Sequence, residues 1–250
     1  MISLENTNKN NFCAGESLPP LDRNRLIVSA DDFGISSQAN KNILHLVSLG
    51  KIDRVAVMVD GDVSLDEIGL LIKSGVKLDV HLEMNRSSVE NRAKQANATF
   101  PRLLRFFFLY ISGGVGNLET ERLWENQITK FHQLFEKLPD GINSHEHIHY
   151  FPPFFRITCA LREKYAIPYI RFAMKRIVPY SSLRALIIDR LRKINQRSSS
   201  RTPSLSSDYM TSLNWMPDMD DLMNRFQHGS IEVVCHPEMN AEYHYIINRF

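Results

Sequence analysis

The chain has few cysteines and no long apolar run. Only three of its 250 residues are cysteines, Cys13, Cys159 and Cys235, and no C-x-x-C pair occurs. Such isolated cysteines argue against a disulfide framework and suit a reducing compartment. No apolar stretch approaches the ~20 residues of a membrane-spanning helix. The first residues lack the basic start and apolar centre of a signal peptide, so we expect a cytoplasmic protein.

Several motifs that mark well-known enzyme classes are also missing. The sequence contains no G-x-S-x-G, so it gives no sign of a serine nucleophile. It contains neither G-x-G-x-x-G nor a Walker loop, which leaves nucleotide binding without support. A formal net charge of +2 makes no case for a nucleic-acid partner.

Strand-like and helix-like segments alternate from Arg25 onward, after an Asn-rich polar stretch. We expect a flexible leader over 1–23 and one domain over 24–250. Serial strand–helix units predict a parallel sheet with right-handed crossovers. An open doubly wound sheet fits this pattern. We favour an irregular (β/α) barrel of six or seven mostly parallel strands, because a barrel gathers the ends of all its strands around one mouth. The expected strands are 25–31, 54–60, 77–83, 142–149, 168–173, 207–213 and 230–236.

The segment Ile142–His149 contains an H-x-H-x-H run. If it continues a strand, the imidazoles of His145, His147 and His149 project from the same face, because side chains alternate along a strand. Three imidazoles on one face suit a metal site or a proton-transfer surface. The alternative is a solvated strand face.

Acids and histidines end three other strand-like segments. Asp31 and Asp32 follow an apolar run, His81 lies near the end of its segment, and His236 stands just before a proline. Ligands of α/β folds collect at the carboxyl ends of strands. Neighbouring residues on a strand face opposite ways, so the two acids can take different roles. One Asp with two His is a common ligand set for a catalytic divalent ion, which leaves the other Asp and His for acid–base work.

These residues together resemble the YdjC-like carbohydrate deacetylases, which include chitooligosaccharide deacetylases and enzymes linked to hopanoid synthesis. The resemblance rests on the ordered segments Ala30–Gly34, Val80–Leu82, Ser144–His149 and Cys235–Pro237, with Asn40 between the first two. It implies a deacetylase-type (β/α) barrel and metal-dependent hydrolysis of an N-acetyl group on a sugar. Many relatives have Asp before Ser-His, where this chain has Asn143, and an amide supplies no charge to a metal-bound imidazole.

Carried over by position, the resemblance implies Asp32, His81 and His145 as ligands of one divalent ion, Mg²⁺ or Zn²⁺. Asp31 falls where the family keeps its general base, and His236 where a second acid–base group lies. The alternatives are another metal-assisted hydrolase, such as a deformylase or phosphoesterase, and a non-catalytic carbohydrate-binding protein on the same fold.

Further residues bear on the substrate. We expect His147 and His149 to contact the sugar or to support the metal site. The alternative is that both are ordinary polar residues exposed to solvent at the opening of the barrel. Arg171 is expected to orient a substrate oxygen or an acid, or to form a plain salt bridge. The aromatic segment 100–111 and the basic segment 171–201 suggest a lipid-linked glycan as substrate and peripheral contact with the inner membrane surface. The alternative for the basic segment is an ordinary barrel helix that packs its apolar stripe inward and exposes its charges to solvent. The oligomeric state is open, with a homodimer as one option.

Overall fold

The computed structural model describes residues 21–84, 117–179, 181–198, 205–215 and 217–250. Residues 1–20 of the predicted leader and the aromatic segment 100–111 lie outside the described residues. The side chain of Leu21 is buried, and its backbone N–H donates to the carbonyl of Arg249 at 2.8 Å. Arg23 forms an ion pair with Asp53 at 2.8 Å.

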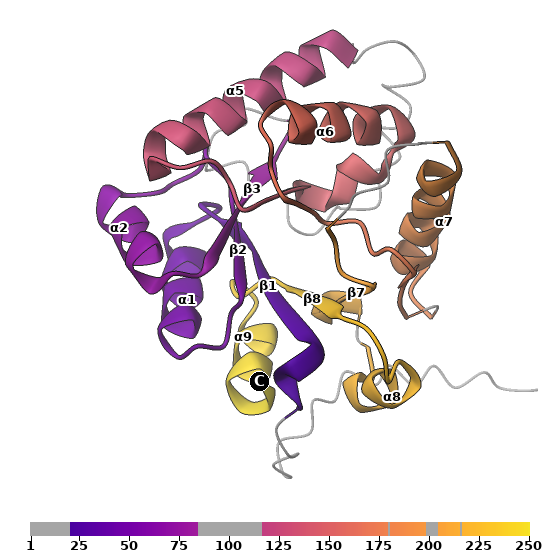
Figure 1. Ribbon diagram of the computed structural model, residues 1–250. Helices are drawn as coiled ribbons and strands as arrows, with labels where there is room; N and C mark the ends of the chain where they lie inside the picture. The colour runs from indigo at the N-terminus through magenta and orange to yellow at the C-terminus, as the bar shows by residue number, and fades with distance from the viewer. Residues whose placement is uncertain (1–20, 85–116, 180, 199–204, 216) are drawn as a thin grey trace, which may run out of the picture.

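Among the described residues, eight parallel strands form one sheet, and helices surround it (Figure 1). The strand order is β5-β4-β3-β2-β1-β8-β7-β6, so the consecutive strands β5 and β6 are the two edges of the sheet. The strands are β1 (Leu26–Phe33), β2 (Arg54–Val57), β3 (Lys77–Leu82), β4 (Gly141–Ser144), β5 (Tyr169–Ile170), β6 (Arg176–Ile177), β7 (Tyr209–Ser212) and β8 (Ile231–Cys235).

The expected barrel-like α/β fold is confirmed, but the strand count is eight and not six or seven. The difference arises after Pro168, where one strand was predicted over 168–173. The chain pairs there only at Tyr169 and Ile170, and a second short strand follows at Arg176 and Ile177. Ala173 lies between them in the left-handed region, with φ 59°, which interrupts the extended backbone.

The helices follow the predicted alternation. They are α1 (Ser37–Ser48), α2 (Leu65–Ser74), α5 (Asn117–Phe135), α6 (Pro152–Lys164), α7 (Leu183–Ser198), α8 (Met219–Arg225) and α9 (Asn240–Arg249). Local chemistry sets their ends: a capping box between Ser64 and Glu67 begins α2, and Gly75 ends it with φ 70°. The C-terminal helix α9 was not predicted. No side-chain cap marks its start, because Met239 occupies the N-cap position.

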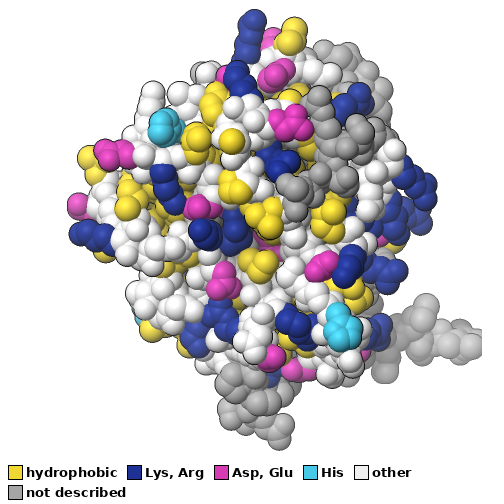
Figure 2. Space-filling view, viewed as in Figure 1, with side chains coloured by type: hydrophobic (Ala, Val, Ile, Leu, Met, Phe, Trp, Pro, Cys, Tyr) yellow, Lys and Arg dark blue, Asp and Glu magenta, His cyan; other side chains and the backbone are white. Residues whose placement is uncertain are grey.

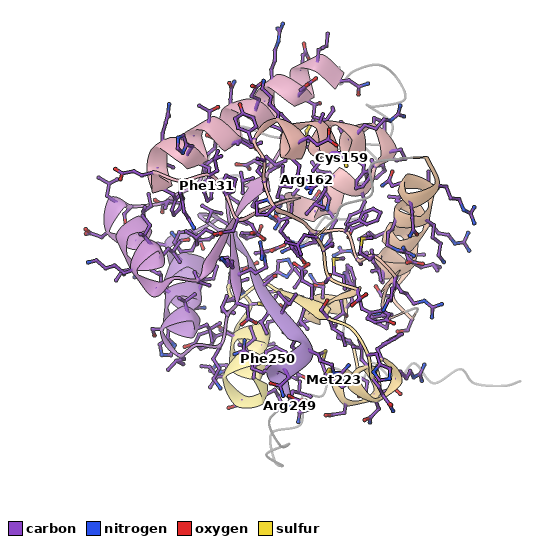
Figure 3. The ribbon with its side chains drawn as sticks, viewed as in Figure 1. Phe131, Cys159, Arg162, Met223, Arg249 and Phe250 are labelled. Carbon is purple, nitrogen blue, oxygen red and sulfur yellow. The ribbon has the colours of Figure 1, made fainter. Side chains whose placement is uncertain are left out.

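Apolar side chains from the strands and the surrounding helices form one continuous core, and the side chains of the described residues fill the interior (Figure 3). Polar and charged side chains are also fully buried in the middle of the molecule. They include Ser29, Asp79, Arg171 and Glu232, each 0% exposed. Buried polar and charged groups need hydrogen-bond partners, and each of these four has one. Ser29, Asp79 and Glu232 lie on strands, and Arg171 directly follows β5. The carboxyl ends of the strands carry the site described next.

Candidate functional site

Three potential metal ligands meet at the carboxyl ends of three strands of the sheet. Asp32 lies at the end of β1, His81 near the end of β3 and His145 directly after β4. Asp32 Oδ1 is 2.8 Å from His145 Nδ1 and 3.1 Å from His81 Nε2. One ligand atom from each residue lies within 4.8 Å of the other two. The sequence prediction that these three residues form a cluster therefore agrees with the geometry.

A β-bulge at the end of β1 places both acids inside the site. Ala30 pairs with Val55 and Phe33 with Val57, so Asp31 and Asp32 together face one residue of β2. Asp32 adopts a left-handed backbone, with φ 65°. The acids are only 2% and 3% exposed. Simple alternation was expected to point them to opposite faces; the bulge replaces that alternation and re-aims the side chains, as bulges near active sites do.

The prediction of a histidine face on one continuous strand is wrong. Strand β4 ends at Ser144, and His145–Tyr150 form a 3₁₀ segment. Glu146 and His147 have φ 56° and 57°, which turns the chain away from strand geometry. Period-two alternation consequently does not apply, and the three histidines occupy different surroundings.

His145 alone of these histidines contacts Asp32. His149 is fully buried, and its ring nitrogens lie 2.7 Å from Ser144 Oγ and 2.9 Å from the Arg171 carbonyl oxygen. Because both nitrogens have partners inside the protein, the geometry fits the supporting role among the two expected for His149. His147 keeps Nδ1 buried without a hydrogen-bond partner and packs its ring against Trp215 at 5.7 Å between centroids. Of His147 and His149, His147 is therefore the one with a ring nitrogen left for the predicted sugar contact.

Asp31 forms a buried two-pronged ion pair with Arg171. The guanidinium donates from Nη1 at 2.6 Å and from Nη2 at 2.7 Å, while its Nε donates to Glu232 at 2.7 Å. Burial alone would raise the pKa of Asp31, but the charge and hydrogen bonds of Arg171 lower it to about 2. Arg171 is 0% exposed and was predicted as a substrate-binding residue. Its contacts match the alternative in which it orients an acid.

His81 and His145 have different electrostatic surroundings. His81 Nδ1 lies 2.5 Å from Asn143 Oδ1, on the side of the ring opposite Asp32. Desolvation lowers the pKa of His145, but the charge of Asp32 and its hydrogen bond raise that pKa to about 9. Burial raises the pKa of Asp32, but the charges and hydrogen bonds of His145 and His81 lower that pKa well below its usual value. Without a metal ion, Asp32 is thus an anion and His145 a cation at neutral pH.

His236 directly follows β8, and β8 is the strand next to β1 in the sheet. Its backbone N–H donates to Glu242 Oε2 at 2.7 Å, and its Nδ1 lies 3.7 Å from the same oxygen. Burial lowers the pKa of His236, but the hydrogen bond and charge of Glu242 raise it to about 10. His236 therefore carries a proton at neutral pH. Sequence reasoning missed Glu242, since it belongs to the unpredicted helix α9.

Glu238 is a second acid that the sequence did not single out. It lies two residues beyond His236, and its Oε2 is buried without a hydrogen-bond partner. Burial raises the pKa of Glu238 to about 7, and the nearby charge of Asp32 adds to the effect while His236 opposes it. An unpartnered carboxyl oxygen at this position can accept a hydrogen bond from a ligand. The sequence could have indicated Glu238, because it lies two residues after His236 at the end of the same strand.

Comparison with known proteins places this arrangement in a family. Residues 25–248 match the model of the YdjC-like protein family. The chain belongs to the YdjC-like family. The match covers every strand of the sheet and all of the site residues discussed above. The resemblance inferred from the sequence motifs is thereby confirmed.

Curated relatives are similar over most of the chain. A chitooligosaccharide deacetylase of Escherichia fergusonii is 25% identical over 222 residues, which cover 85% of this chain and 81% of that protein. A carbohydrate deacetylase of Halalkalibacterium halodurans is 28% identical over 149 residues, 58% of this chain and 62% of that protein. A mouse carbohydrate deacetylase is 22% identical over 162 residues, 62% of this chain and 52% of that protein.

A solved structure agrees with the fold. The crystal structure of an Enterococcus faecalis V583 protein, assigned provisionally to cellobiose-phosphate cleavage, superposes with a TM-score of 0.54. The two proteins are 17% identical, and the match covers 84% of this chain and 79% of that chain. At this identity the likeness concerns the fold alone.

Proposed function

We propose that this chain is a metal-dependent hydrolase that removes the N-acetyl group from an acetylated sugar. The observation that carries the proposal is the cluster of Asp32, His81 and His145, with an ionised Asp31 beside it that is paired with Arg171. Membership of the YdjC-like family and relatives named carbohydrate and chitooligosaccharide deacetylases support the substrate class.

The three residues fit a divalent metal ion. One carboxylate and two imidazoles form a common ligand set that leaves positions open for water and substrate. Asp32 and His81 are nearly fully buried, and the His145 side chain is 31% exposed, so solvent reaches the cluster at His145. A bound ion would polarise the acetyl carbonyl and lower the pKa of water. Reloading the chain with Mg²⁺ or with Zn²⁺ distinguishes the two expected ions.

The other side chains would supply the proton transfers. Water attacks the carbonyl carbon of the acetamide, and Asp31, which remains ionised, takes the proton that the water loses. Arg171 holds both oxygens of that carboxylate in one orientation, which leaves further lone pairs for the water. As the C–N bond breaks, His236 donates its proton to the nitrogen, so acetate and a free amine leave. The raised pKa of His236 keeps that proton available at neutral pH.

Metal binding is expected to release a proton at neutral pH. His145 carries a proton below its raised pKa of about 9, and a metal ligand nitrogen must give that proton up. Affinity should therefore increase with pH up to about 9 and level off above it, with about one proton released per ion at pH 7. Calorimetric Zn²⁺ titrations in two buffers of different ionisation enthalpy measure this number. A binding enthalpy independent of the buffer would contradict the protonated state of His145.

The proposed activity is tested by acetate release. The purified chain is stripped with a chelator, reloaded with Zn²⁺, Mg²⁺ or Co²⁺, and given soluble N-acetylated oligosaccharides or an acetylated lipid-linked sugar in anionic vesicles. We expect acetate and free amine in equal amounts, only with metal. Formylated sugars and a phosphoester test the two alternative hydrolases. Cleavage of one of these without acetate release, or sugar binding without any turnover, would refute the deacetylase proposal.

Peripheral membrane contact stays a prediction, and the vesicle arm of that assay tests it. No helix among the described residues is long and apolar enough to span a membrane. Figure 2 shows basic side chains gathered over α7. Ion pairs engage several cations of the basic segment 171–201, because acids bind Arg171, Lys175, Arg192 and Lys193. The charge offered to an anionic lipid is accordingly smaller than the sequence count indicates.

A further inference from the structure

A polar chain of side chains leads from His81 into the barrel interior. Strands β3 and β4 pair in parallel, with Asp79 opposite Gly141 and His81 opposite Asn143. Residues two apart share a face of the sheet, so Asp79 lies behind His81 and next to Asn143. Asn143 Nδ2 donates to Asp79 Oδ2 at 3.4 Å, and Asn143 Oδ1 faces His81 Nδ1 at 2.5 Å. Asp79 and Asn143 are both 0% exposed.

The order of these groups determines which nitrogen of His81 carries a proton. An ionised carboxylate only accepts hydrogen bonds, so the amide of Asn143 must turn its NH₂ group toward Asp79. Its oxygen then faces His81, and an amide oxygen also only accepts. His81 must therefore carry its hydrogen on Nδ1. Nε2 is then the nitrogen that faces the ligand cluster, 3.1 Å from Asp32 Oδ1, and the one whose lone pair a metal ion would take.

Arg54 and Gly141 keep Asp79 in position. The Arg54 guanidinium donates from Nε to Oδ2 of Asp79 at 2.9 Å and from Nη2 to Oδ1 at 2.5 Å. Opposite Asp79, a Cβ on Gly141 would lie 2.5 Å from both Arg54 Nη2 and Asp79 Oδ1. Only glycine leaves room for this pair. The carboxylate thus has one orientation, and its Oδ2 faces the amide of Asn143.

We propose that Asp79 is a positioning residue for the metal site, acting through Asn143 to hold His81 in the tautomer that binds a metal through Nε2. The proposal rests on the proposed function, in which His81 is a metal ligand. It also explains how the chain manages with Asn143 where many relatives have an acid. The carboxylate behind the imidazole is that of Asp79, two residues before His81 on β3, and Asn143 on β4 connects the two through one more hydrogen bond. Burial raises the pKa of Asp79, and the charge and hydrogen bonds of Arg54 oppose that rise.

The test is Zn²⁺ affinity without substrate, measured by competition with a chromophoric chelator. Asp79→Asn removes the charge and lets the amide of Asn143 turn over, so we expect binding roughly 10–100-fold weaker, the usual effect of losing such a supporting group. The double variant Asp79→Asn with Asn143→Asp puts a carboxylate directly behind His81. We expect it to restore affinity to within about threefold of the parent.

A matched control separates this role from general damage. Asp189 on α7 is also a buried acid paired with an arginine, at 2.9 Å from Arg192. Its other partners are Lys193 and the backbone N–H of Ile177, neither of which is a proposed metal ligand. Asp189→Asn should lose stability without losing Zn²⁺ affinity. If Asp79→Asn leaves Arg54 too poorly paired to fold, Arg54→Met with Asp79→Leu removes both charges of the pair. We expect that variant to bind Zn²⁺ as weakly as Asp79→Asn.

The outcomes decide between the possibilities. Unchanged Zn²⁺ affinity in a folded Asp79 variant overturns the proposal, and so does a folded swap variant that fails to recover affinity. Equal losses in the Asp79 and Asp189 variants would make Asp79 purely structural. A parent protein that binds no Zn²⁺ refutes both this proposal and the metal site. A parent that binds Zn²⁺ but releases no acetate refutes only the proposed function, and the affinity series still decides the role of Asp79.

Discussion

Replacing His81 or His145 with alanine is expected to abolish both metal retention and hydrolysis, and so is Asp32→Ala. In the part of the chain that the structure describes, these three side chains form the ligand cluster, with ligand atoms within 4.8 Å of one another. Removing one of three protein ligands leaves an ion only weakly held. Elemental analysis after gel filtration measures the retained metal, and acetate release measures turnover.

The matched control for the imidazole variants is His45→Ala. His45 is an exposed histidine on α1, where its Nδ1 lies 2.6 Å from the Tyr243 hydroxyl, away from the strand ends. That variant should keep its metal and its activity. Full metal occupancy in His81→Ala or His145→Ala would remove the substituted residue from the ligand set.

Asp31→Asn should retain the metal and lose turnover by roughly 10²–10⁴-fold, the usual contribution of a positioned general base. The amide keeps the size of the side chain but cannot accept a proton from water. Metal content should be unchanged, because Asp31 binds Arg171 and not the histidines. The measurement is kcat for acetate release together with elemental analysis.

Glu232→Gln is the comparison for Asp31→Asn. Glu232 is the other acid bound to Arg171, at 2.7 Å, and it also accepts from Tyr169 at 2.6 Å. Its substitution should lower stability by a similar amount, since each change weakens the pairing of a buried arginine. We expect a smaller loss of turnover, because Glu232 does not reach the site. Normal turnover in Asp31→Asn, or loss of its metal, would show that the roles of the two acids are assigned wrongly.

The sequence alone located most of the candidate site. Apolar runs ending in Asp or His predicted that Asp32, His81, His145 and His236 lie at strand ends, and parallel strands bring such ends to one edge. These inferences depend on local patterns that burial imposes on every strand. The alternation of strands and helices predicted the fold class for the same reason, although the short strand β6 and the uncapped helix α9 carry too little local signal.

The local pattern failed where the backbone leaves regular geometry. Alternation placed Asp31 and Asp32 on opposite faces, but a one-residue bulge with φ 65° at Asp32 brings both inward. The same rule aligned three histidines, but left-handed residues after Ser144 separate His145 from His149. Such conformations are unfavourable for most residues in isolation, so only the surrounding structure can hold them.

Tertiary structure alone decided how the charges are paired. Arg171 meets Asp31 across 140 residues of chain and Glu232 across 61, and Asn143 reaches Asp79 across 64. No spacing rule connects such distant residues, because their separation is set by the order of strands in the sheet. Composition and motifs therefore identified the chemical groups of the site. The pairings between these groups exist only once the sheet has formed. They determine which acid stays ionised and which nitrogen of His81 faces the ligand cluster.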